Sequence, residues 1–97
     1  MLVKMGVHVS DLERPIRRAL SKIDWVFLEN AKQEAVITST NEGTHSPSSL
    51  HYANLAVDIR LPKDDVKKTL GVLKEVLGPS YDVILEASHF HIEYDPK

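Results

Sequence analysis

Apolar residues recur at helical spacing near the start of the chain, at Leu12, Ile16, Ala19, Leu20 and Ile23. Such spacing places them on one face of an amphipathic helix. Residues 10–13, with serine first and glutamate last, have the form of a capping box. Proline fits a helix only in its first turn, so Pro15 predicts that the regular helix begins near Glu13 or Arg14.

Two segments in the middle of the chain have the pattern of β-strands. Residues 34–40 are rich in β-branched side chains, which favours a short strand. Residues 55–61 alternate: the apolar face would hold Leu55, Val57, Ile59 and Leu61, and the other face Ala56, Asp58 and Arg60. Between them, residues 41–49 are rich in Gly, Ser, Thr and Pro, which predicts a loop.

A second helical pattern follows Pro62, which we expect to open the helix. Its apolar stripe consists of Val66, Leu70, Leu73 and Leu77. Gly78 and Pro79 would then close it, because neither residue continues a helix well.

The last segment has the pattern of a β-hairpin. If residues 82–86 and 89–93 pair around Ala87 and Ser88, residues whose numbers sum to 175 face each other and share a side of the sheet. One side then carries Val83, Leu85, Phe90, Ile92 and Tyr94, and the other side carries Glu86, His89 and His91. The apolar side is expected to join the core, and the polar side to form a site.

These elements predict an α+β fold, with a small, mostly antiparallel sheet, two helices packed on one face and a polar site on the other face. A chain of 97 residues with 42% hydrophobic content is expected to form a single domain, residues 1–97, around one modest core.

Composition narrows the range of functions. The formal net charge of -2 gives no electrostatic footprint for nucleic acid or for an anionic membrane, so neither is expected as a partner. The start of the chain lacks the apolar region of a signal peptide, which predicts synthesis in the cytoplasm. Because the sequence has no cysteine, a metal site would have to use histidine and carboxylate ligands.

Four of the five histidines, together with two carboxylates, lie in two short segments: His45, His51 and Asp58 in the first, and Glu86, His89 and His91 in the second. Imidazole and carboxylate groups are typical ligands of zinc sites that keep an open position. Two histidines at positions i and i+2 of one strand lie about 6.6 Å apart and point the same way. This pattern predicts zinc as the cofactor.

Residues 49–58, from Ser49 to Asp58, resemble the Ser-x-His-x-x-Gly-x-Ala-x-Asp signature of zinc D-alanyl-D-alanine carboxypeptidases and related peptidoglycan peptidases. The pair His89 and His91 resembles the second signature of that family. The hedgehog signalling domain, which shares the fold and zinc site of these enzymes, is also similar. The resemblance covers residues 36–95 and departs from the signature at Asn54, which replaces the glycine. Asparagine tolerates left-handed backbone better than most residues do.

The resemblance implies a role for each candidate residue. By motif position, His51, Asp58 and His91 would bind zinc, and Glu86 would be the catalytic base. His89 would stabilise the oxyanion or hold the base. An alternative alignment on a Glu-x-x-His pattern makes His89 the zinc ligand in place of His91, and both alignments stay open here.

The family also implies a substrate. The expected function is a zinc metallopeptidase that hydrolyses a peptide bond in the stem peptide of bacterial peptidoglycan, as a carboxypeptidase or as an endopeptidase. His45 and Ser49, in the loop expected to line the cleft, are the candidate substrate-binding residues. We expect a monomer that acts on the cell wall after release. The alternative is a catalytically inert, zinc-stabilised binding module of hedgehog-like fold.

Overall fold

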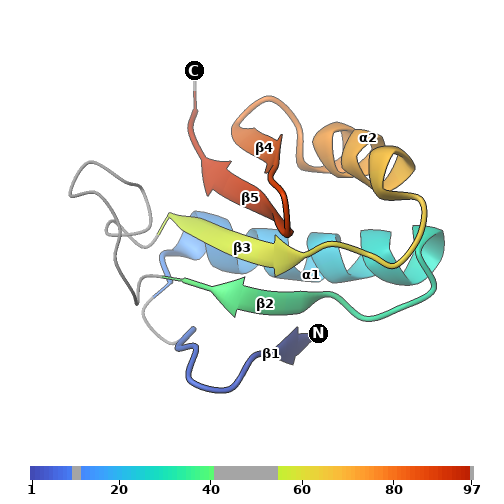
Figure 1. Ribbon diagram of the computed structural model, residues 1–97. Helices are drawn as coiled ribbons and strands as arrows, with labels where there is room; N and C mark the ends of the chain where they lie inside the picture. The colour runs from blue at the N-terminus through green and yellow to red at the C-terminus, as the bar shows by residue number, and fades with distance from the viewer. Residues whose placement is uncertain (10–11, 41–54, 97) are drawn as a thin grey trace.

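The computed structural model describes residues 1–9, 12–40 and 55–96 of the chain (Figure 1). In this part of the protein the elements are β1 (Leu2–Val3), α1 (Arg14–Asn30), β2 (Val36–Ser39), β3 (Ala56–Arg60), α2 (Val66–Leu77), β4 (Tyr81–Leu85) and β5 (His89–Tyr94). The strands form one sheet in the order β1-β2-β3-β5-β4. Only β1 and β2 pair in parallel, so the predicted α+β fold with a mostly antiparallel sheet is confirmed.

Both helices cover the same face of the sheet, as expected, and α1 runs behind β2 and β3 in Figure 1. Phe27 of α1 meets Phe90 of β5 edge to face, with ring centroids 6.2 Å apart. Both rings are fully buried. The other fully buried core side chains of highest volume are Ile16, Ile23, Val26, Ile37, Val57, Ile59, Leu73 and Ile92. The opposite face carries no described helix and is called the open face below.

Helix α1 begins at Arg14, in agreement with the sequence, but the expected capping box is wrong. Glu13, and not Ser10, occupies the N-cap position, and its side chain makes no capping hydrogen bond. Pro15 lies in the first turn, where a missing N–H leaves no helical hydrogen bond unmade. The helix also extends well past Ile23, because Val26 and Phe27 continue its buried face.

Helix α2 begins at Val66, and the expectation that Pro62 opens it is wrong. Asp65, just before the helix, adopts left-handed backbone with φ 57° and ψ 39°, so the chain turns there. The predicted end is confirmed, because Leu77 is the last helical residue and Gly78 has φ 81°. A positive φ costs glycine little, which suits it to stop the helix.

The hairpin of β4 and β5 has the predicted register. Its pairs run from Tyr81 opposite Tyr94 to Leu85 opposite Phe90. The backbone N–H of Glu86 donates to the carbonyl oxygen of His89 at 2.9 Å, which closes the turn. Alternation then directs Phe90 toward the helices, and His89 and His91 toward the open face.

Strand β3 lies between β2 and β5 and has the predicted faces. Val57 and Ile59 are fully buried in the core, whereas Ala56 and Asp58 belong to the open face. Asp58 nevertheless has only 8% of its surface exposed. The sequence pattern did not predict β1, whose two residues pair with Val36 and Ile37 of β2.

Candidate metal centre

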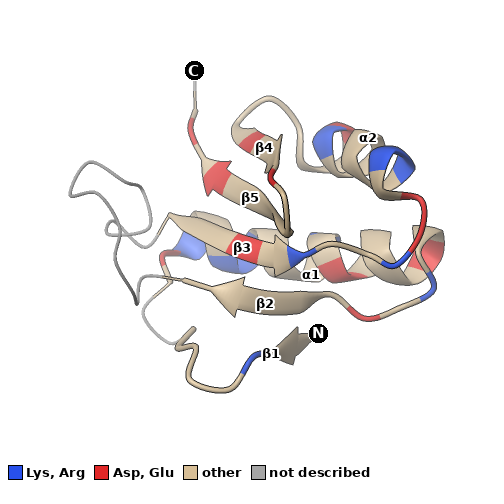
Figure 2. Cartoon of the chain, viewed as in Figure 1, with Lys and Arg blue, Asp and Glu red and all other residues tan. Residues whose placement is uncertain are grey.

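The open face gathers charge on its central strands. Figure 2 shows acidic positions on β3, β4 and β5, and basic positions on both helices and at the end of β3. Asp58 pairs directly with His91, so their side chains leave neighbouring strands at the same level. Nδ1 of His91 and Oδ1 of Asp58 are 3.0 Å apart. This contact is the centre of the candidate site.

His89 approaches the same carboxylate from the other side. Its Nε2 lies 3.6 Å from Oδ2 of Asp58, so each carboxylate oxygen faces a different imidazole. Thr38 of β2 donates its hydroxyl to the backbone carbonyl of Asp58 at 3.3 Å. Asp58 is therefore held between the two histidines by side-chain contacts and by the sheet.

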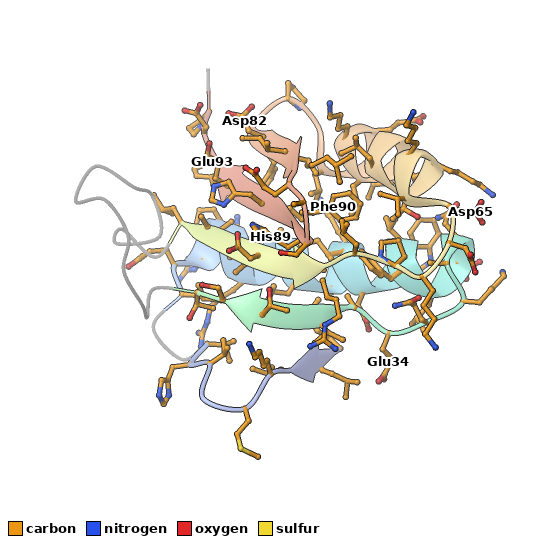
Figure 3. All side chains as sticks on the ribbon, in the orientation of Figure 1. Glu34, Asp65, Asp82, His89, Phe90 and Glu93 are labelled. Carbon is orange, nitrogen blue, oxygen red and sulfur yellow. The ribbon has the colours of Figure 1, made fainter. Side chains whose placement is uncertain are left out.

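Glu93 is the member of the site that sequence reasoning missed. Its Oε2 lies 3.4 Å from Nε2 of His91, so both ring nitrogens of His91 face a carboxylate. Figure 3 shows Glu93 and His89 on β5 and Asp82 on the neighbouring strand β4. The signal was available in the sequence, because Glu93 stands two residues after His91 and a strand places such residues on one face.

The two carboxylates raise the pKa of His91 above its usual 6.5. The hydrogen bond with Asp58 is the main cause, and the contact with Glu93 adds to it. Partial burial acts in the opposite direction, because it disfavours the charged imidazolium. The site therefore attracts a positive charge, either as a proton on His91 or as a cation.

A proton titration can detect this attraction in metal-free protein. We expect His91 to titrate above pH 6.5, and Asp58→Asn to lower its pKa because the substitution removes the charged acceptor. The raised pKa means that this contact stabilises the fold fully below about pH 6.5 and loses that contribution as the pH rises through the folded-state pKa. NMR shifts of the ring protons measure both values, and a wild-type His91 pKa below 6.5 would contradict the assignment.

The contact between Asp58 and His91 can be compared with the geometry of a zinc site. Ligand atoms lie 2.0–2.2 Å from a tetrahedral zinc ion, which puts neighbouring donors about 3.4 Å apart. Oδ1 of Asp58 and Nδ1 of His91, 3.0 Å apart, are slightly closer than that value. Among residues 1–9, 12–40 and 55–96, however, no three His, Asp or Glu side chains form a metal-binding group. A zinc centre at Asp58 would need a ligand from elsewhere in the chain, and the predicted ligand His51 lies outside the described residues.

The remaining predicted residues divide into two groups. Glu86 is exposed at the hairpin turn, opposite His89, which places both side chains on the open face. Its backbone N–H donates to the carbonyl oxygen of His89. His45 and Ser49, the candidate substrate-binding residues, lie outside the part of the chain that the structure describes.

Comparisons with known proteins add no relative. No family model matches the chain, and searches of curated proteins and of solved structures found no match. The helices in the described ranges include none with the length and apolar character needed to span a membrane. The functional assignment therefore rests on the motifs and on the geometry around Asp58.

Proposed function

We propose that this protein is a zinc metallopeptidase of the hedgehog and D-alanyl-D-alanine peptidase type, and that it hydrolyses a peptide bond in the stem peptide of peptidoglycan. One observation carries the proposal: Oδ1 of Asp58 lies 3.0 Å from His91, and Oδ2 lies 3.6 Å from His89. A carboxylate between two imidazoles is the type of donor set that the resemblance implies for zinc, and it supports the proposal. The substrate class comes from the resemblance of residues 49–58 to the peptidase signature.

The ligands in this proposal are His51, Asp58 and His91. A zinc ion held there would polarise the carbonyl of the substrate and lower the pKa of water, so that water attacks at neutral pH. His91 must lose its proton to bind the metal, and metal affinity should therefore rise with pH. Glu93 orients the His91 ring through its contact with Nε2.

Two residues of the open face supply the remaining chemistry. Glu86 accepts a proton from the attacking water and returns it to the leaving amine when the peptide bond breaks. His89 donates a hydrogen bond to the carbonyl oxygen as negative charge develops on it. In the structure Nε2 of His89 faces Asp58 at 3.6 Å and Nδ1 lies 3.1 Å from the Ser88 hydroxyl, so this role requires the His89 ring to turn one N–H toward the substrate.

A zinc-stabilised binding module without turnover is the second candidate. It needs the three ligands but has no need of Glu86. The exposed position of Glu86 at the hairpin turn favours this candidate, because charged side chains are ordinarily exposed whether or not they have a catalytic role. Digestion of purified muropeptides by the zinc-loaded protein decides between the two, since hydrolysis adds one water to the mass of the products. Intact muropeptides after prolonged incubation would favour the binding module.

Metal content tests the ligand set. We expect about one zinc per chain, and a sharp loss of affinity in His51→Ala, Asp58→Ala and His91→Ala, because each variant removes one of three protein ligands. His89→Ala is the matched control, since it removes an imidazole beside the same carboxylate but should keep the metal. Elemental analysis and calorimetric titration measure both quantities.

Two outcomes would revise this set. Loss of zinc in His89→Ala together with retention in His91→Ala would make His89 the ligand, as the Glu-x-x-His alignment has it. Full zinc occupancy in a protein that carries both His51→Ala and His91→Ala would rule out the centre. Chelation of the wild type should also lower its melting temperature, because zinc bound to the folded state adds stability.

A further inference from the structure

The residues of the open face stand in rows across β3, β5 and β4. Arg60 of β3 pairs with His89 of β5, and the N–H of Glu86, just after β4, donates to the carbonyl oxygen of His89. Asp58 and His91 form the next row, two residues along the same strands. Side chains that stand opposite each other on one face of a sheet lie close together. Arg60 and Glu86 therefore flank His89 on opposite sides, beside the candidate metal centre.

Arg60 is the only lysine or arginine in these three strands. The same strands contain three carboxylates, those of Asp58, Asp82 and Glu93, and the pairing places all of them on the open face. A negative group of a ligand is repelled by these carboxylates and attracted by a cation among them. Arg60 is thus the residue of this region that suits an anionic group, at the end of β3 (Figure 2).

The Arg60 side chain is available to a ligand. It is exposed, and no described carboxylate forms an ion pair with its guanidinium. A ligand carboxylate that binds there would not have to displace an acidic side chain of the protein. This distinguishes Arg60 from His89 and His91, which both face Asp58.

Distance limits which part of a bound peptide can reach Arg60. Residues i and i+2 of a strand lie about 6.6 Å apart, and this is the spacing from Asp58 to Arg60. One residue of an extended peptide spans at most about 3.6 Å. The long arginine side chain covers the remaining distance. A carboxylate one residue beyond a carbonyl group held at the metal centre can therefore reach the guanidinium.

We propose that Arg60 binds the free C-terminal carboxylate of the residue that leaves on hydrolysis, so that the protein is a carboxypeptidase and not an endopeptidase. This inference rests on the proposed peptidase function. The guanidinium presents a planar fork of N–H donors, which fits a carboxylate through two parallel hydrogen bonds. The substrate of an endopeptidase continues beyond the leaving residue and brings a neutral amide to the same position.

Two stem peptides that end in D-alanyl-D-alanine, one a free acid and the other a C-terminal amide, test the subsite. Zinc-loaded wild type should cleave the acid with a kcat/KM at least about tenfold above that of the amide, because a hydrogen bond to a charged group is stronger than one to a neutral group. Arg60→Gln should lower kcat/KM for the acid to the value for the amide. Arg60→Lys keeps the charge but loses the fork, and should give an intermediate preference.

Binding is measured apart from cleavage in zinc-loaded Glu86→Gln protein, by calorimetric titration with the same two peptides. The acid should bind at least about tenfold more tightly than the amide, and adding Arg60→Gln should abolish the difference. Lys63→Gln is the matched control, since it removes an exposed positive charge three residues away, outside the strands. It should leave the preference unchanged. Circular dichroism and zinc content verify that each variant is folded and loaded.

The outcomes separate this inference from the proposed function. If wild type cleaves neither peptide but the acid binds more tightly in a way that requires Arg60, the peptidase function is wrong and the carboxylate subsite stands. Equal affinity for acid and amide, or no binding of either peptide, would overturn the subsite. An equal loss of affinity for both peptides in Arg60→Gln would also overturn it, because Arg60 would then bind another carboxylate of the stem peptide.

Discussion

Phe90→Ala is expected to lower the free energy of unfolding by about 3–5 kcal/mol, the range for removal of a buried aromatic ring. Phe90 is fully buried and packs edge to face on Phe27, so truncation loses buried apolar surface and leaves a cavity. Small domains are stable by only about 5–15 kcal/mol. This single change should therefore remove a large share of the stability.

Urea unfolding followed by circular dichroism measures this loss. Met5→Ala is the control, since Met5 is 96% exposed and its truncation should change stability by less than about 0.5 kcal/mol. If Phe90→Ala does not fold, Phe90→Leu should fold with a smaller loss. A cost below about 1 kcal/mol for Phe90→Ala would contradict the buried position of the ring.

Phe90 also connects the core with the candidate site. It stands between His89 and His91, and its burial fixes which face of β5 the two imidazoles share. A variant at Phe90 that still folds should therefore bind zinc more weakly than wild type, although the ring does not belong to the proposed ligand set. Calorimetric titration of Phe90→Leu measures this effect.

Local patterns were enough to predict the hairpin and the faces of its strands. The spacing of Val83, Phe90 and Ile92 predicted the buried side of each strand, because a shift by one residue moves apolar side chains to the other face. The register followed from the placement of Ala87 and Ser88 in the turn. The same reasoning placed Asp58 opposite the apolar face of β3. Helix α1 was also predicted at its start, where Pro15 limits the possible positions.

Features that depend on distant or unusual backbone contacts were not predicted. The start of α2 depends on the left-handed conformation of Asp65. An aspartate in the sequence does not by itself indicate that conformation. Strand β1 depends on pairing with the distant segment around β2: the N–H of Leu2 donates to the carbonyl of Ala35, just before β2, at 2.8 Å, and the N–H of Lys4 donates to the carbonyl of Ile37 at 2.9 Å. Two residues are too few to give a strand pattern in sequence.

The candidate site has features of both kinds: some follow from local sequence patterns, and others depend on contacts between distant segments. Each histidine and Asp58 had a predictable face, but their meeting requires β3 and β5 to be neighbours, which depends on the order of strands in the sheet. The family resemblance supplied this neighbourhood as an expectation, and the 3.0 Å contact between Asp58 and His91 is consistent with it. Glu93 was passed over because the motif does not include it.

Glu86→Gln is expected to reduce stem-peptide cleavage by at least about 100-fold, while zinc content and folding stay nearly unchanged. Glutamine keeps the size of the side chain but cannot accept the proton of the attacking water. General-base catalysis is typically worth about 10²–10⁴-fold, which corresponds to roughly 3–5 kcal/mol of barrier. Because Glu86 is exposed, its replacement should cost little stability.

Glu75→Gln makes the same chemical change on the exposed surface of α2 and should leave cleavage at the wild-type rate. Cleavage by both variants and by wild type is compared at equal zinc content, with mass spectrometry of muropeptide products. Equal cleavage by Glu86→Gln and wild type would show that Glu86 is not the base, and His89, which approaches Asp58 on the same face, would become the leading candidate. If the zinc-loaded wild type cleaves no stem peptide, the peptidase proposal is wrong and the binding module takes its place. Glu86 would then have no catalytic role.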